Sequence, residues 1–592
     1  MSELLVLLGL LVALTKPLGL YMAKVFEGKR TLLSRFLLPV ERLLYRFCGV
    51  HPEIEQVWTS YAGSCLAFGL ISFLLFYVVL RIQGWLPFNP QHFGTPLAPQ
   101  GATPVTPDLA FNIAVSFMTN TSWQSYPGES TLSYLSQLLA LGVQAFIATA
   151  TGIAVAIAFV RGLIREKTSC LGNFWVDVTR CTLYILLPLA LVAGLFLCSR
   201  GVIQSFRPYQ DVTTLEGGKQ TIAFGPVASW ESIKLLSAGD GGGFFNANSA
   251  HPFENPSPTT NLFEMLLMFA IPAGLTYTFG RMVGDQWQGW TLFMVMVLLF
   301  VGGACLLSWS EYRGNPALAA AGVDSRHSGA NPGGNMEGKE VRFGIGASAV
   351  YSAVSTASST GAVNSMHDSF SPVGGMVQLF NMLTGEVIFG GTGIGLISMI
   401  LMVLLTVFLA GLMVGRTPEY LGKKIEAKEM KMVMLSYVAT SVPILVLTSA
   451  ALLIPFRHGG YWNPPGGVLG NIANTGPHGL TEILYANASA IHTNGSAFAG
   501  LNANTPWFNL TLGIEMLIGR FMVIIPALAI AGSMVRKQRI AATSGTLPTQ
   551  GPLFAALLIG AIILVTALTF FPALSLGPLV EHFLMHTGVV FR

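Results

Sequence analysis

Four short polar segments are the part of the sequence best suited to hold an ion. Each is rich in Gly, Ser, Thr and Asn and lies between two apolar stretches; they are 119–124, 239–246, 358–364 and 493–498, called here the four knots. A dehydrated cation in a membrane needs oxygen ligands in place of its water shell, and rings of backbone carbonyls supply them. Glycine and small hydroxyl residues let the backbone extend and turn its carbonyls toward a common axis.

The residue types in the knots restrict the ion. A transition metal favours Cys or His ligands, and His492 only neighbours the fourth knot. A divalent cation favours several carboxylates, whereas Asp240 is the one carboxylate within a knot. A monovalent cation remains as the good match. Any single knot could be an ordinary turn, but four at equivalent places favour a filter. The candidate filter residues are Asn120, Thr121, Ser122, Gln124, Gly239, Asp240, Gly241, Ser359, Thr360, Gly361, Thr493, Asn494 and Gly495.

Composition places the knots in a membrane protein. The chain is 52% hydrophobic and 10% charged, whereas soluble proteins carry about 25% charged residues. Ten apolar stretches are long enough to cross a ~30 Å hydrocarbon core. The sequence therefore predicts an all-α integral membrane protein of about ten transmembrane helices, and no concentrated basic domain points to nucleic acid. The predicted spans are 3–22, 62–82, 131–160, 180–199, 260–282, 288–309, 373–413, 433–455, 507–535 and 552–572.

The order of apolar stretches and knots indicates an internal repeat. The unit of span, short helix, knot and span occurs about four times, which predicts four helix–pore-loop–helix repeats in a pseudo-fourfold arrangement. The whole chain, 1–592, is then a single polytopic membrane domain. Its predicted parts are an extra N-terminal helix at 1–25, pore repeats at 57–162, 178–283, 286–416 and 431–536, and an extra C-terminal helix at 550–574.

The basic residues predict the orientation. By count, 19 of the 32 Lys and Arg residues lie in alternate loops, from Lys24 in the first to Arg539 in the last. The positive-inside rule makes these loops cytoplasmic, so that both termini face outward. The N-terminal segment lacks a basic leader and a small-residue cleavage site, and we expect a retained first helix.

The stretch 373–413 is too long for one ordinary span. As a single helix it would be ~60 Å long, twice the hydrocarbon thickness. Its middle carries Gly390, Gly391, Thr392, Gly393 and Gly395, which predicts a helix break below the filter that acts as a gating loop. The alternative is a loose kink or a helix that extends into the cytoplasm.

Two charged residues are predicted inside the membrane. Glu386 is placed one turn before the break, and Arg520 lies deep in the ninth span. Intramembrane ionisable residues are functional candidates by default. Arg520 could repel a cation on a straight path to the cytoplasm, or it could form a structural ion pair with Glu515. Glu386 could attract that cation or pair with Arg520.

Several longer motifs carry a family resemblance that covers essentially the whole chain. The chain resembles the A subunit of the bacterial Kdp potassium-transporting ATPase, within the superfamily of potassium transporters. The motifs are N-T-x-W-Q at 120–124, GGGFFNANSAHPFENP at 241–256, TGAVN-x-MHDS at 360–369, GEVIFGGTGIG at 385–395, GRTPEYLGKKIE at 415–426 and NGSAFAG at 494–500.

The resemblance implies a potassium-binding subunit of an ATP-driven uptake complex in the bacterial inner membrane. Such a subunit passes extracellular K+ to a P-type ATPase catalytic subunit, works with small accessory subunits, needs no organic cofactor and hydrolyses no ATP by itself. Gln124 and Gly241 would line the filter, 390–395 would gate passage, and Glu386 and Arg520 would lie near the inner vestibule. Ser122 and Gly239-Asp240 depart from the family pattern, where Asn and Thr-Asn are common.

Two alternatives compete with this interpretation. A secondary potassium transporter of the Trk/Ktr type would share four repeats, but the flanking spans and the full-length motifs favour the Kdp type. A polytopic membrane enzyme would need clustered catalytic groups, and the sequence contains no GxSxG, HExxH or GxxxxGK[ST] motif.

Overall fold

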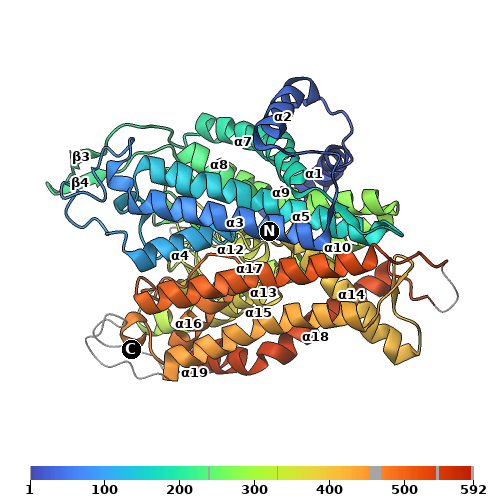
Figure 1. Cartoon of the computed structure of the whole chain (residues 1–592). Helices are drawn as coiled ribbons and strands as arrows, with labels where there is room; N and C mark the ends of the chain where they lie inside the picture. Colours follow the sequence, from blue (N-terminus) through green and yellow to red (C-terminus); the bar gives the residue numbers. More distant parts are fainter. Residues whose placement is uncertain (1, 238–240, 330, 454–467, 542–545, 588–592) are drawn as a thin grey trace.

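The structure is a computed structural model that describes every residue except 1, 238–240, 330, 454–467, 542–545 and 588–592. Its described part is mostly helical, with short antiparallel strand pairs in the loops (Figure 1). The helices are α1 (Ser2–Phe26), α2 (Ser34–Cys48), α3 (Trp58–Arg81), α4 (Pro107–Met118), α5 (Gln144–Ile164), α6 (Phe174–Arg180), α7 (Leu187–Ser199), α8 (Val227–Ser237), α9 (Pro258–Val283), α10 (Gln286–Arg313), α11 (Pro316–Ala320), α12 (Gly344–Ala357), α13 (Pro372–Leu383), α14 (Ile394–Val414), α15 (Ala427–Leu453), α16 (Gly476–Ile491), α17 (Pro506–Met534), α18 (Pro552–Leu574) and α19 (Val580–His586). The strands are β1 (Gln56–Val57), β2 (Cys170–Gly172), β3 (Gln210–Thr213), β4 (Lys219–Ile222), β5 (Glu419–Tyr420) and β6 (Lys423–Lys424).

Ten helical stretches of the described chain are long and apolar enough to cross a membrane, as the sequence predicted. Several of them, α3, α5, α15 and α17 among them, run side by side across the view in Figure 1. A π-helical segment that begins at residue 136 leads directly into α5. Two further π-helical segments join α6 to α7 and α18 to α19. The spans are Ser2–Phe26, Trp58–Arg81, Ser136–Ile164, Phe174–Ser199, Pro258–Val283, Gln286–Ala320, Ile394–Val414, Ala427–Leu453, Pro506–Met534 and Pro552–His586.

Four shorter helices enter the protein without crossing it. These half-helices are α4, α8, α12 and α16, of 12, 11, 14 and 16 residues. At 1.5 Å per residue, none is long enough to cross a ~30 Å core. Each ends where a knot begins, so the partial negative charge of its C-terminus points at the knots.

The first helix packs tightly on the fifth span. Leu4, Leu7, Leu11 and Met22 of α1 are buried. A Cβ at Gly19 would lie 2.6 Å from the carbonyl oxygen of Gly274 in α9, so only glycine permits this approach of the two backbones. The extra N-terminal helix is thereby a fixed part of the membrane domain.

The seventh apolar stretch is interrupted near its middle, as the sequence predicted, but the interruption begins earlier than 390 and ends at 393. Helix α13 ends at Leu383 and α14 begins at Ile394, so the interruption is 384–393, called here the break. Glu386 therefore lies inside the break rather than one turn before it, and Gly395 belongs to the first turn of α14. The reason is that Glu386 and Phe389 adopt positive φ angles of 59° and 50°, a conformation that helix propensity does not anticipate for non-glycine residues.

Candidate functional site

Three knots follow the same backbone path. In each, two residues separated by one position adopt the left-handed conformation: Asn120 and Ser122 (φ 64° and 55°), Ser359 and Gly361 (56° and 74°), and Thr493 and Gly495 (47° and 88°). Non-glycine residues adopt this conformation at a cost of roughly 1–2 kcal/mol each, and such strain clusters at functional sites. Its recurrence at equivalent positions indicates one shared function. Gly239 and Asp240 of the second knot lie outside the described residues.

Glycines bring the four knots together at one place. A Cβ at Gly361 would fall on the carbonyl oxygen of Asn494, and one at Gly495 would fall on the carbonyl oxygen of Thr121. A Cβ at Gly241 would lie 2.6 Å from the carbonyl oxygen of Gly495. Segments from different repeats therefore place carbonyl oxygens against the glycines of other knots, where there is no room for side chains.

Hydrogen bonds fix the relative position of neighbouring knots. The Asn120 amide donates to the carbonyl oxygen of Ser237, the last residue of α8, at 3.3 Å, and accepts from the Thr149 hydroxyl at 3.1 Å. The Asn494 amide donates to the carbonyl oxygen of Ser355 in α12 at 3.1 Å. Each asparagine thus links its own knot to the half-helix of a neighbouring repeat.

Hydroxyl pairs brace the first and third knots internally. The Thr119 and Thr121 hydroxyls lie 2.8 Å apart, and the Ser358 and Thr360 hydroxyls 2.6 Å apart. These bonds pair the hydroxyls of each knot with one another. The carbonyl oxygen of Thr121 meets the second knot, where it accepts from the backbone N–H of Gly241 at 3.2 Å.

Gln124 braces the second knot from the first. Its amide oxygen accepts from the backbone N–H of Gly243 at 2.9 Å, and its amide nitrogen donates to the Tyr126 hydroxyl at 3.2 Å. Gln124 also lines a cavity of about 430 Å³, called here the outer cavity, whose wall includes Gly241, Gly361 and Gly495. The knots are therefore open to this cavity on one side.

His367 in the wall of the outer cavity is neutral. Burial, and secondarily the ammonium group of Lys339, lower the pKa of His367 to about 3. Its Nδ1 pairs with the Tyr485 hydroxyl at 2.8 Å. The imidazole therefore adds no positive charge beside the entrance to the knots at physiological pH.

The break lies against the knots. The Thr392 hydroxyl donates to the Ser237 carbonyl oxygen at 2.7 Å, and the Thr493 hydroxyl donates to the Glu386 carboxylate at 2.7 Å. A Cβ at Gly393, where φ is 91°, would fall on the backbone of Gly152 in α5. The break is thus held between α5 and the ends of two half-helices, with Gly390, Gly391, Thr392 and Gly393 all buried.

Arg520 contacts the chain near the break. One guanidinium nitrogen donates to the carbonyl oxygen of Ala148 in α5 at 2.8 Å. The hypothesis of an ion pair with Glu515 is wrong for this structure, since both carboxylate oxygens of Glu515 lack a hydrogen-bond partner among the described residues. A Cβ at Gly152 would lie 3.0 Å from the Arg520 guanidinium, which places the charge beside the contact of Gly152 with the break.

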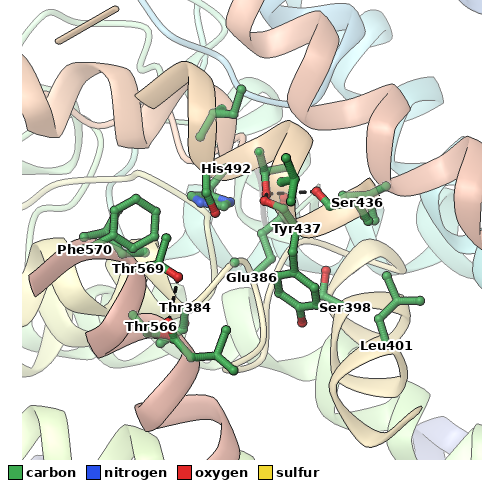
Figure 2. A pocket seen from close by; sticks show the side chains of 18 of the residues that line it. Thr384, Glu386, Ser398, Leu401, Ser436, Tyr437, His492, Thr566, Thr569 and Phe570 are labelled. Carbon is green, nitrogen blue, oxygen red and sulfur yellow. Dashed lines mark hydrogen bonds between the residues drawn. The ribbon is translucent and has the colours of Figure 1, made fainter. Parts of the chain in front are cut away.

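A second cavity, of about 460 Å³, lies below the fourth knot. Figure 2 shows Glu386 in its wall with His492, Tyr437 and Ser398 around it. The wall extends to side chains on the flank of α14 and α15 that are roughly half exposed, including Leu409 (41%), Met434 (46%) and Val438 (51%). This side cavity therefore leads from Glu386 toward the flank of the helix bundle.

A comparison with known families agrees with this geometry. The family described as "Potassium-transporting ATPase A subunit" matches residues 5–583. The chain belongs to this family.

Relatives of the A-subunit family align over nearly their whole length. A protein of Solibacter usitatus (strain Ellin6076), named potassium-transporting ATPase potassium-binding subunit, is 56% identical over 576 residues, which cover 97% of this chain and 96% of the relative. A protein of the same name from Mesorhizobium japonicum is 53% identical, and the alignment covers 100% of this chain and 99% of the relative. The solved potassium transporter TrkH of Vibrio parahaemolyticus is 16% identical with a TM-score of 0.49, over 88% of this chain and 96% of that one.

Sequence reasoning missed residues that act on the knots from outside them. Asn248 donates to the Gly241 carbonyl oxygen at 2.8 Å, and Lys234 contacts Asn248. The available signal was a lysine in the apolar half-helix just before the second knot. Its partners come from later in the chain, so the sequence did not show what it binds.

Proposed function

We propose that this chain is the potassium-binding and translocating subunit of a high-affinity, ATP-driven potassium uptake complex. The observation that carries the proposal is the meeting of the knots, where the carbonyl oxygens of Thr121, Asn494 and Gly495 occupy the places of absent side chains. Carbonyl rings of this kind replace the hydration shell of K+. The names of the relatives support the choice of ion.

The filter takes K+ from the outer cavity. The thirteen candidate residues are its proposed members, with Gln124 as a brace and with Gly239 and Asp240 in the second knot. The half-helix C-termini add favourable partial charge at the ion. K+ is the transported ion, and no organic cofactor takes part.

The break is the proposed barrier below the filter. Thr392 and Gly393 hold it against α5 and α8, and the guanidinium group of Arg520 disfavours a cation on the straight path. Glu386 offers a carboxylate to an ion that leaves the fourth knot. The side cavity then provides a lateral route to the flank of α14 and α15.

The energy comes from another polypeptide. The sequence carries no nucleotide-binding motif, and we propose a P-type ATPase catalytic subunit as the partner, with small accessory subunits, in the bacterial inner membrane. Both termini face outward. The lateral route predicts that the catalytic subunit docks where the side cavity opens.

Reconstitution tests this function. Vesicles that contain the chain and its catalytic partner should take up K+ with ATP hydrolysis stimulated by micromolar to millimolar K+, whereas the chain alone should hydrolyse no ATP. K+-stimulated hydrolysis by the purified chain alone would contradict the division of labour. Absence of K+ binding to the complex would contradict the proposed function itself.

A further inference from the structure

A buried charge cluster lies directly behind the second knot. Lys234, one turn before the end of α8, is fully buried, as are Glu231, Glu254 and Glu264. Its ammonium group lies 2.9 Å from the Glu231 carboxylate and 3.4 Å from that of Glu254. Burial of a charge is costly unless it is paired and hydrogen-bonded. A lysine at this position therefore needs these polar partners, whereas an apolar residue would need none.

The cluster orients the amide of Asn248. Lys234 Nζ donates to Asn248 Oδ1 at 2.5 Å, and the backbone N–H of Ser249 donates to the same oxygen at 2.8 Å. An ammonium group and a backbone N–H are donors only, so the amide atom that faces them must be the oxygen. The amide nitrogen is thereby turned the other way and donates to the Gly241 carbonyl oxygen at 2.8 Å.

Gly241 is a residue of the second knot that lies against the third and fourth knots. A Cβ at Gly361 would lie 2.7 Å from the Gly241 Cα, and one at Gly495 would lie 2.9 Å from it. A shift of the Gly241 carbonyl therefore alters the space enclosed by the third and fourth knots. The first and third knots are braced by hydroxyls of their own, whereas this carbonyl is held by Asn248.

We propose that Lys234 is a positioning residue for the potassium filter: it holds Asn248 in the one amide orientation that fixes the Gly241 carbonyl. The inference rests on the proposed function, because it assigns Lys234 a role in ion affinity. Without the ammonium group, the backbone N–H of Ser249 is the one remaining donor of these two to Oδ1, so the amide turns over more readily and sets Oδ1 against the carbonyl oxygen. Two acceptors then face each other, and the carbonyl moves away from its place in the filter.

The test compares two buried lysines in the assembled complex. Lys234→Met should raise the Kd for K+ about tenfold, the size expected for loss of a hydrogen bond to a charged group, and should weaken discrimination between K+ and Rb+. The matched control is Lys339→Met, which removes a fully buried lysine paired with Glu311 at 2.8 Å in the loop before α12. The control should keep the parent Kd within about twofold.

A double-mutant cycle tests whether Lys234 acts through Asn248. Asn248→Ala should weaken K+ binding, and Lys234→Met in that background should add no further loss, because the amide it orients is gone. Additive losses would overturn the proposal, as would a parent Kd in Lys234→Met. A merely structural role would lower the number of sites per chain and leave the Kd and the K+/Rb+ ratio of the folded fraction unchanged, which would also overturn it.

A charge-balanced variant keeps the test decisive if Lys234→Met does not accumulate. Glu231→Gln with Lys234→Met removes one buried carboxylate together with the cation and should show the same tenfold loss; the parent Kd in this variant overturns the proposal. If the parent complex itself binds no K+, the proposed function fails. If the parent binds K+ and the Lys234 variants match it, only the positioning role fails.

Discussion

The region of the knots and the region of the break and the side cavity are built differently. Above and between the knots, backbone carbonyls and glycines from four repeats meet, with equivalent φ angles in three of them. Below them, the break comes from the third repeat alone, and the side cavity is lined by side chains of α14, α15, α17 and α18 around a single carboxylate, Glu386. In the proposed function, ion selection is thus a property of the repeat, whereas closure and exit depend on features that occur once.

The break provides the largest test of this contrast. Shortening 390–395 should turn the complex into a passive leak, because Thr392 and Gly393 no longer fill the space between α5 and the end of α8. K+ flux into vesicles without ATP should rise by roughly tenfold or more over the parent.

Removal of 215–217 from the exposed turn between β3 and β4 is the control for a shortened loop. Vesicles as tight as the parent after shortening 390–395 would show that the break is not the barrier.

A glycine of the knots provides the next test. Gly495→Val should raise the Kd for K+ roughly tenfold, since a β-branched residue at φ 88° costs ~1–2 kcal/mol and its Cβ would fall on the Thr121 carbonyl. Gly241→Ser should act in the same direction. Titration of the purified complex with K+ measures both.

Gly302→Val is the matched control, because a Cβ at Gly302 in α10 meets nothing within 4 Å. If Gly495→Val and Gly302→Val bind K+ equally well, the knots are ordinary turns.

Glu386 tests the lower region by charge alone. Glu386→Gln keeps an acceptor for the Thr493 hydroxyl but removes the negative charge, so K+ transport should slow several-fold while the Kd changes less. Glu515→Gln, a second buried carboxylate whose oxygens lack described partners, should not slow transport. Equal slowing in both variants would show that Glu386 has no special place on the path.

Acid provides the smallest effect and tests the outer cavity. His367, with its pKa lowered to about 3, stays neutral as the pH falls from 8 to 6, so the Kd for K+ should change by less than about twofold through this group. Folding stability, in contrast, depends on pH through this residue. The unfolded histidine takes up a proton below about pH 6.5 while the folded one stays neutral, so the contribution of neutral His367 to the free energy of unfolding is lost as the pH falls further. A Kd for K+ that rises as the pH falls through 6.5 in the parent, but not in His367→Asn, would contradict a neutral wall of the outer cavity.

The sequence predicted the membrane spans and the knots because both are local. Apolar length alone marks a span, and glycine with small polar residues marks a knot. The limits of the break were wrong because Glu386 and Phe389 take left-handed conformations that only tertiary contacts enforce. Lys234 was missed for the same reason, since Asn248 and Glu254, 14 and 20 residues later, come to it through the fold.

The pairing of Arg520 shows a further limit of sequence reasoning. Glu515 and Arg520 are five residues apart on α17, which made an ion pair plausible from sequence. Positions five apart point in different directions on a helix, and Arg520 instead reaches the Ala148 carbonyl of α5. Contacts between repeats, which decide the roles of these residues, carry no local signature.

The most direct test is to locate a heavy analogue of K+ in the complex by anomalous scattering. Thallium(I) should give a peak among the carbonyl oxygens of Thr121, Asn494 and Gly495, K+ should displace it, and Gly495→Val should weaken it. No peak between the knots of an actively transporting complex, or peaks confined to the side cavity, would contradict the assignment of the knots as the potassium filter.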